Sequence, residues 1–330
     1  MPDPTLPSGN FSSDTMVGFY REMMRIRKVE NQLGRDSRSG TLPGPVHLYI
    51  GQEAVAVGIC SQLSDSDWIC STHRGHGHFL AKGGSVDLLM AEVYGRETGI
   101  CKGLGGSMHV ADFSKGIIGA NGIVGAGISI ATGAAWAAKL DGAGAVSVAF
   151  FGDGAANQGV LGEALNVAVL WDLPVIFVCE NNGFSEFSPS ATVTAGRIAD
   201  RASPYGAAGE EVDGNDLIAV HQCAARAIER ARSGGGPTLI EARTYRLRGH
   251  VEAETTFLAA PYRSEDEVAE WEKRDPIVAL ARRMVEAGQA SEDDLAAVEQ
   301  EIDAEVAAAV RFAEDAPWPD VKAATGYMFA

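Results

Sequence analysis

Apolar residues recur along the chain with two different spacings, and these predict where helices and strands alternate. A helical spacing runs from Asp14, which is placed to cap the first turn, to about Leu33. Further helices are predicted at residues 52–63, 85–94, 125–139, 157–171 and 216–232. Short extended or apolar runs predict strands at 68–71, 145–151, 174–179 and 238–245, with another short strand ending at Val212. The last seventy residues are predicted to be mostly helical and highly charged, and the charges of these helices, including 291–312, are interpreted as a solvated face and not as a special site.

Two stretches follow neither spacing. THRGHGH, residues 72–78, is predicted to be a polar loop, and residues 99–122 are rich in glycine. The chain has 39 glycines, concentrated between Gly75 and Gly162. A long irregular stretch inside a domain is usually a functional loop, so we expect 99–122 to serve a site.

The unit formed by residues 145–151, 157–171 and 174–179 predicts the fold class. A continuous apolar run is typical of a strand that is covered on both faces, as in a parallel sheet. The crossover rule makes the two strands parallel and their connection right-handed. We therefore predict an α/β fold with a mostly parallel sheet flanked by helices. The predicted division is an N-terminal tail and helix (1–40), the α/β core (41–260) and a helical C-terminal extension (261–330), which form one structural domain overall.

Composition and charge narrow the class of protein. The 330 residues are 46% hydrophobic, which is enough for a core and excludes general disorder. With 27 Lys+Arg and 44 Asp+Glu, the net charge of −17 argues against nucleic acid or an anionic membrane as the main partner. No apolar run has the length of a membrane span, and residues 1–10 do not resemble a signal peptide. The 5 cysteines form no C-x-x-C pair, so we expect reduced thiols and a cytoplasmic protein.

Two polar residues follow consecutive predicted strands. Asp153 comes just after the run at 145–151, and Asn182 follows the run at 174–179. Parallel strands open their carboxyl ends on one edge of the sheet, so a single crossover brings both side chains to one crevice. Their oxygens suit Mg²⁺, which usually takes substrate phosphates as further ligands, and the carbonyl of Phe184 is a candidate third protein ligand. Each turn alone is common in proteins, but the two in this order are a much stronger indication.

Other kinds of site are disfavoured by the same sequence. The histidines of THRGHGH lack a cysteine or fourth histidine at the spacing that a zinc site needs. Gly125-x-Gly127 is followed by Ile130, so the dinucleotide motif G-x-G-x-x-G is not present there. The Gly-Lys-Ser/Thr of a P-loop is also missing.

GDGAANQG followed by ENNG resembles the thiamine diphosphate motif. From about residue 15 to 280, the chain resembles the alpha subunit of the first component of the 2-oxoacid and acetoin dehydrogenase complexes. The resemblance is carried, in the family's order, by HLYIGQEA, THRGHGH, GLGGSMH, NGIVGAG, GDGAANQG, ENNG and TYRLRGH. THRGHGH, ANGIVGAG and VDGNDL look more like acetoin dehydrogenase than pyruvate dehydrogenase of the mammalian type. The implied fold is the thiamine-diphosphate-binding fold, with 41–260 as the diphosphate-binding core.

The resemblance implies a role for each of several positions. Magnesium would be held by Asp153, Asn182 and the carbonyl of Phe184. The other expected cofactor contacts are His73, Arg74, Gly152, Gly154, Ala155 and His250 near the diphosphate, and Gly122 and Val124 at the aminopyrimidine ring.

Two histidines match the family's catalytic positions. His47 would line the substrate pocket near the reactive carbon of thiamine diphosphate, and His250 would touch the phosphates or orient the substrate. A neutral imidazole can donate or accept a proton near neutral pH. The chain departs from the pyruvate enzymes at His73, where they commonly carry Tyr, and at Arg248, where they often carry His.

The resemblance also implies partners. The carboxylate that activates thiamine diphosphate belongs to a beta subunit in this family, so the active site is expected at an alpha–beta interface, in an α₂β₂ tetramer. A lipoyl-bearing acyltransferase would receive the acyl unit. The expected reaction is the cleavage of acetoin first, of pyruvate second, and of a branched 2-oxoacid third.

Overall fold

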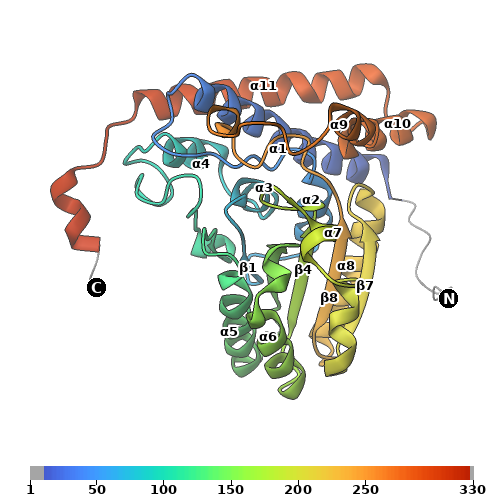
Figure 1. Cartoon of the computed structure of the whole chain (residues 1–330). Helices are drawn as coiled ribbons and strands as arrows, with labels where there is room; N and C mark the ends of the chain where they lie inside the picture. Colours follow the sequence, from blue (N-terminus) through green and yellow to red (C-terminus); the bar gives the residue numbers. More distant parts are fainter. Residues whose placement is uncertain (1–10, 328–330) are drawn as a thin grey trace.

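A parallel sheet of six strands forms the centre of the computed structural model, which describes residues 11–327 (Figure 1). The strand order is β2-β1-β3-β4-β8-β7, and each neighbouring pair is parallel. The strands are β1 (Trp68–Cys70), β2 (Ile117–Gly119), β3 (Ser147–Gly152), β4 (Val175–Asn181), β7 (Ala208–Asp213) and β8 (Thr238–Arg243). This confirms the predicted α/β fold class. The predicted loose tail at residues 1–10 lies outside the described residues.

Side chains of the central strands alternate between two apolar cores, one on each face of the sheet. Phe150 packs in the core built with α1, α2 and α8, whereas its neighbour Phe151 packs in the core built with α5 and α6. Successive side chains of a strand point to opposite faces, so both faces of β3 must be apolar. The helices are α1 (Ser13–Arg38), α2 (Glu53–Cys60), α5 (Ala126–Asp141), α6 (Gly159–Leu170) and α8 (Leu217–Arg232). Helices α5 and α6 lie side by side in Figure 1.

Helices at the two ends of the chain pack together. In Figure 1, α11 (Glu292–Asp315) runs along α1 and α4 (Val86–Val93). Arg27 of α1 joins three elements, because Nε donates to Glu53 at 2.6 Å and a terminal nitrogen donates to Asp275 at 2.7 Å. Asp275 caps α10 (Pro276–Glu286), which follows α9 (Glu265–Glu272). The helical character of both ends is as predicted, and the division at residues 40 and 260 stays a prediction.

The remaining elements are short. Strands β5 (Phe184–Ser185) and β6 (Ser188–Pro189) form an antiparallel hairpin. The others are α3 (Gly75–Ala81), α7 (Ser190–Val193), η1 (Phe113–Lys115), η2 (Ala155–Asn157), η3 (Ala199–Tyr205), η4 (Glu254–Thr256) and η5 (Val321–Tyr327). Between residues 11 and 327, no helix combines the length and apolar character that crossing a bilayer requires.

Three local predictions need correction. Ser12, not Asp14, caps α1 with its hydroxyl, and the helix continues to Arg38. Most of THRGHGH is helical, as α3, because Gly75 and Gly77 let the backbone approach Ala120 and Tyr49, where a Cβ would come within 2.5 and 2.2 Å of side-chain atoms. The glycine-rich stretch 99–122 contributes the edge strand β2, which is only 3 residues long and so lacks a recognisable pattern.

The carboxylate of Glu92, in α4, binds the backbone of the glycine-rich stretch. This glutamate has no solvent exposure, and its carboxylate accepts four backbone N–H groups. The donors are Cys101 and Gly103 at 2.8 Å on one oxygen, and Gly105 and Gly106 at 2.7 and 2.9 Å on the other. These N–H donors take the place of the water molecules that the carboxylate loses when it is buried.

We expect Glu92→Ala to lower the free energy of unfolding by about 3 kcal/mol, since it leaves buried amides without an acceptor. Chemical denaturation of the chain measures this effect. Asp87→Asn, an exposed change on the same helix, is the control and should shift stability by less than about 0.5 kcal/mol. An unchanged midpoint for Glu92→Ala would contradict the role given to this carboxylate.

Candidate functional site

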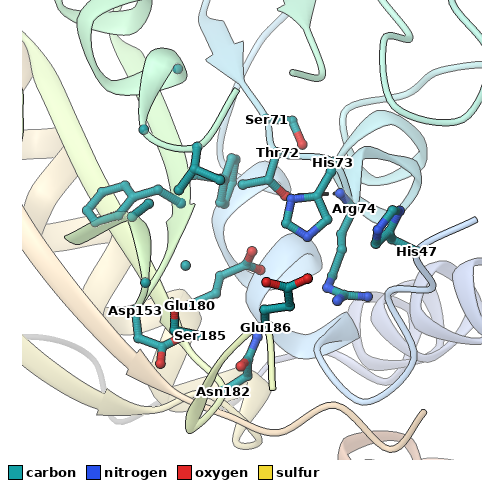
Figure 2. Close-up of a pocket in the computed structure, with 18 of the residues that line it drawn as sticks. His47, Ser71, Thr72, His73, Arg74, Asp153, Glu180, Asn182, Ser185 and Glu186 are labelled. Carbon is teal, nitrogen blue, oxygen red and sulfur yellow. Dashed lines mark hydrogen bonds between the residues drawn. The ribbon is translucent and has the colours of Figure 1, made fainter. Parts of the chain in front are cut away.

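A cavity of about 320 Å³ opens at the carboxyl ends of β1, β3 and β4. Every residue predicted for the site lines it: His47, His73, Arg74, Gly122, Val124, Gly152, Asp153, Gly154, Ala155, Asn182, Phe184 and His250. Figure 2 shows side chains from several separate segments directed into this space. The structure thus brings the predicted residues together, and the role of each remains a prediction.

One side of the cavity carries Asp153 and Asn182. Asp153 is 1% exposed, and its Oδ2 has no hydrogen-bond partner among the described residues. Burial raises the pKa of this carboxyl, and Ser190 and Arg246 act in the opposite direction. A buried carboxylate oxygen without a partner is costly unless a cation or donor meets it. The donor set therefore fits a hard cation at this point.

Asn182 is oriented by its neighbours. Its Nδ2 donates to Oε1 of Gln52 at 3.1 Å, and its Oδ1 accepts the N–H of Phe184 at 3.2 Å. Because the amide nitrogen is held by Gln52, the oxygen is the atom that remains available as a ligand. Gln52 belongs to the HLYIGQEA motif, and the sequence alone assigns no role to this position.

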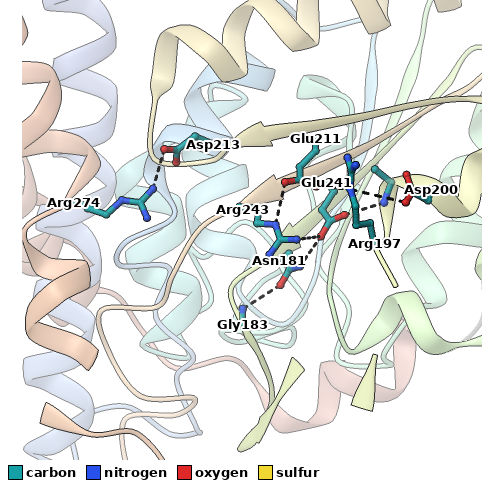
Figure 3. Close-up of polar contacts among 10 residues, drawn as sticks. Asn181, Gly183, Arg197, Asp200, Glu211, Asp213, Glu241, Arg243 and Arg274 are labelled. Carbon is teal, nitrogen blue, oxygen red and sulfur yellow. Dashed lines mark hydrogen bonds and ion pairs between the residues drawn. The ribbon is translucent and has the colours of Figure 1, made fainter. Parts of the chain in front are cut away.

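Asn181 and Glu241 support the turn that carries Asn182. Asn181 donates from Nδ2 to Glu241 at 2.7 Å and accepts the N–H of Gly183 at 3.2 Å (Figure 3). Glu241 is 1% exposed and also accepts the N–H of Ala199 at 2.9 Å. Gly183 has a φ of 83°, a conformation that favours glycine. The direction of the turn is thus fixed from the adjacent strand β8.

Three imidazoles form the opposite wall. The ring of His47 lies 4.8 Å from that of His73 and 5.0 Å from that of His250, and the last two are 5.5 Å apart. Burial, and then the positive charge of Arg74, lowers the pKa of His47 to about 3. The same two causes lower the pKa of His73 and of His250 to about 2. All three rings are therefore neutral near pH 7, and Nδ1 of His47 is buried without a partner among the described residues.

Two buried arginines fix the tautomer of His250. Arg74 donates to Nδ1 of His250 at 3.1 Å, and Arg246 donates to the same nitrogen at 2.9 Å. An arginine has no acceptor, so Nδ1 must carry the lone pair and the proton must lie on Nε2. Arg74 also donates to the carbonyls of Leu48 and His250, both at 2.8 Å. Burial and the charge of Arg246 lower the pKa of Arg74 to about 9.

Sequence reasoning missed Arg246, Glu180 and Glu186, which also line the cavity. Arg246 is 2% exposed and its Nε has no partner among the described residues, so it offers a donor to an anionic ligand. Its presence within the TYRLRGH motif is the available signal. Glu180 accepts the hydroxyl of Tyr49, and nothing in the sequence indicates that contact.

The other histidines of THRGHGH have separate partners. His76 contacts Glu30 at 3.2 Å and Ser107 at 2.9 Å, away from the cavity. His78 bonds Ser71 at 2.7 Å and lies 3.2 Å from Glu180. No cluster suited to a metal occurs among the His, Cys, Asp and Glu side chains of the described part of the chain.

The predicted glycine roles have different structural settings. A Cβ at Gly152 would meet no atom within 4 Å, so the backbone there faces open space. At Gly154 a Cβ would come within 2.3 Å of the Ser185 hydroxyl, so a larger residue there would require Ser185 to move. Gly122 has no contact closer than 3.8 Å, from His109. The backbone at Gly152 therefore leaves open space in the cavity beside the unpartnered oxygen of Asp153.

Fold and site together define an α/β protein with a polar cavity, lined by two buried arginines, at the edge of a parallel sheet. The family described as Dehydrogenase E1 component matches residues 21–322, and the chain belongs to this family. Membership implies thiamine diphosphate as the cofactor and confirms the resemblance drawn from the sequence.

Several relatives align over nearly the whole chain. The alpha subunit of acetoin:2,6-dichlorophenolindophenol oxidoreductase of Bacillus subtilis is 48% identical, over 94% of this chain and 92% of the relative. The protein of the same description from Cupriavidus necator is 46% identical, over 93% and 91%. The pyruvate dehydrogenase E1 component subunit alpha of Rhizobium meliloti is 42% identical, over 94% and 89%.

We expect His47, His73 and His250 to stay neutral at pH 5, where an ordinary histidine is protonated. His47 has a pKa of 6.5 in the unfolded chain and of about 3 in the folded chain. Between pH 6.5 and about pH 3 the unfolded chain therefore binds more protons, so the free energy of unfolding decreases as the pH falls. Imidazole ¹⁵N shifts measure the charge directly. Denaturation of His47→Gln at several pH values should show a weaker acid dependence than the unchanged chain. Imidazolium shifts at pH 5 would contradict the neutral state assigned to these rings.

Proposed function

We propose that this chain is the alpha subunit of a thiamine-diphosphate-dependent dehydrogenase that cleaves acetoin and passes the two-carbon unit to a lipoyl-bearing acyltransferase. The observation that carries the proposal is the convergence of Asp153, Asn182 and three neutral histidines on one cavity. The identity of 48% and 46% to two acetoin oxidoreductase alpha subunits supports acetoin as the substrate. A pyruvate dehydrogenase alpha subunit at 42% supports pyruvate as the alternative.

Asp153, Asn182 and the carbonyl of Phe184 would hold Mg²⁺ on the diphosphate. Arg74, Arg246 and His73 would face phosphate oxygens, since two guanidinium groups and a ring line that side of the cavity. Gly152, Gly154 and Ala155 would lie against the diphosphate, and Gly122 and Val124 would present backbone groups to the aminopyrimidine ring. When bound, thiamine diphosphate supplies a carbon nucleophile that stabilises the charge formed as a bond next to a carbonyl breaks.

His47 and His250 would handle protons and orientation. His250 carries its proton on Nε2 because two arginines donate to Nδ1. At Nε2 the ring can therefore donate a hydrogen bond to the substrate but cannot accept one. His47 is neutral and its buried Nδ1 is unpartnered among described residues, which leaves it able to bond a substrate oxygen or proton. The two rings lie 5.0 Å apart, so both can reach one small substrate.

A beta subunit would complete the site, in an α₂β₂ tetramer. Ile123 and Val124 line the cavity yet are 71% and 54% exposed. Large apolar side chains at the mouth of a polar cavity favour contact with another protein. The carboxylate that activates thiamine diphosphate would come from that chain. The 5 unpaired cysteines support a cytoplasmic location as part of the same proposal.

The proposal is tested by mixing the chain with its beta partner. Dye-coupled oxidation of acetoin should appear only when both chains, thiamine diphosphate and Mg²⁺ are present. Comparable turnover by this chain alone would refute a site that is shared between subunits. Turnover of pyruvate without turnover of acetoin would replace the first substrate with the alternative.

We expect thiamine diphosphate to bind the two-chain complex only together with Mg²⁺, because the diphosphate supplies ligands that the protein does not. Asp153→Asn should weaken that binding by about 100-fold or more, since even the outer partners of metal ligands contribute about 10–100-fold. Titration calorimetry with Mg²⁺ and with EDTA measures both effects. Asp266→Asn, an exposed change on α9, is the control. If thiamine diphosphate bound equally well with Mg²⁺ and in EDTA, the assignment of Asp153 and Asn182 as metal ligands would be contradicted.

A further inference from the structure

The tip of the β5–β6 hairpin places an unassigned carboxylate at the cavity. Glu186 lines the cavity and has a φ of 55°, in the left-handed region that side chains other than glycine rarely adopt. Such a conformation costs about 1–3 kcal/mol and persists where the surrounding structure imposes it, often at functional sites. Of the described residues other than glycine with positive φ, Lys102 and Asp172 do not line the cavity. The strained residue is therefore the one beside the site.

The hairpin tip is fixed against the histidine wall. Arg246 donates to the carbonyl of Glu186 at 2.8 Å, and a second nitrogen of the same guanidinium donates to Nδ1 of His250 at 2.9 Å. The ring of Phe187 packs 5.4 Å from His250 and 5.1 Å from Tyr262. One arginine and one aromatic ring thus hold the backbone of Glu186 in a set position relative to a predicted catalytic histidine.

The carboxylate of Glu186 is free to meet a ligand. Figure 2 shows it directed into the cavity, toward the wall that carries His47, His73 and Arg74. It is exposed, and no hydrogen bond or ion pair links it to another described residue. Asp153 and Glu180, the other cavity carboxylates, are 1% and 3% exposed. Glu186 is thus the most accessible negative charge that the described residues present to this cavity.

We infer that Glu186 selects for uncharged substrates, such as α-hydroxyketones, and against 2-oxoacids. This inference rests on the proposed function and names the substrate class for that site. A carboxylate directed toward the histidines can accept a hydrogen bond from a hydroxyl group of the substrate, and it repels the carboxylate of a 2-oxoacid. Under the proposed function the positive charges of Arg74 and Arg246 are met by the diphosphate. Glu186 forms no ion pair with either guanidinium, so its negative charge remains to act on the substrate.

The test compares two substrates in the complex of this chain with its beta partner, loaded with thiamine diphosphate and Mg²⁺. The readout is kcat/KM for pyruvate divided by kcat/KM for acetoin. Glu186→Gln keeps the size of the side chain and removes its charge, so this ratio should rise by about tenfold, as expected for one unit charge at a few ångströms in a partly aqueous site. Glu229→Gln, an exposed change on α8 outside the cavity, should leave the ratio unchanged.

A second measurement covers the case in which Glu186→Gln fails to assemble or to bind cofactor. In the unchanged complex, added salt screens the repulsion, so kcat/KM for pyruvate should rise relative to that for acetoin. An unchanged ratio in a well-assembled Glu186→Gln complex would overturn the inference, as would a ratio in the unchanged complex that is independent of salt. If the complex turns over neither substrate, the proposed function fails instead. If it turns over both and Glu186→Gln changes nothing, the inference alone fails.

Discussion

The shared register of three parallel strands is the constraint on which the site depends. Gly152 of β3 pairs with Glu180 of β4, and Glu180 pairs with Ala242 of β8. The three strands therefore end nearly in line, and the residues that follow them must leave the sheet at one edge. Asp153 and Asn182 follow immediately, and the segment after β8 leads to Arg246. Continuous apolar strands fix this register because both faces are buried, so a slip of one residue would exchange the two cores.

Burial then determines the charge state of the arginine and histidine side chains that lie at this edge of the sheet. Arg74 and Arg246 remain charged in a poorly hydrated place because carbonyls and a ring nitrogen accept their N–H groups. Burial, and then the positive charge of these arginines, lowers the pKa of His47 and of His250 and keeps both rings neutral. The cavity thus combines fixed cations that suit an anionic cofactor with uncharged imidazoles that suit proton transfer. Neither property belongs to a single residue, since each follows from the others nearby.

Much of this arrangement could be predicted from the sequence, for a specific reason. The strands around Phe150 and Phe177 are long, apolar and separated by a helix, so their order and direction follow from general rules. The polar residues that end such strands can therefore be assigned to one site from the sequence alone.

Strand β2 cannot be predicted in this way, because its 3 residues carry no periodic pattern and owe their conformation to pairing with β1. The left-handed φ of Glu186 could not be predicted either, because the sequence does not show that Arg246, which is distant in the chain, donates to the carbonyl of this residue. The α3 helix is a similar case, since its glycines disfavour a helix locally and tertiary contacts override that preference.

The motif GQEA links the site to the scaffold through two adjacent residues. Gln52 holds the amide nitrogen of Asn182, while Glu53 accepts from Arg27 of α1 at 2.6 Å and from the N–H of Gly51 at 2.9 Å. Because Arg27 also binds Asp275, the N-terminal end of α10 is fixed to the same point. A displacement of the terminal helices would therefore act on α2 and, through Gln52, on the orientation of a candidate metal ligand. The geometry of this cavity thus depends on ion pairs that never touch it.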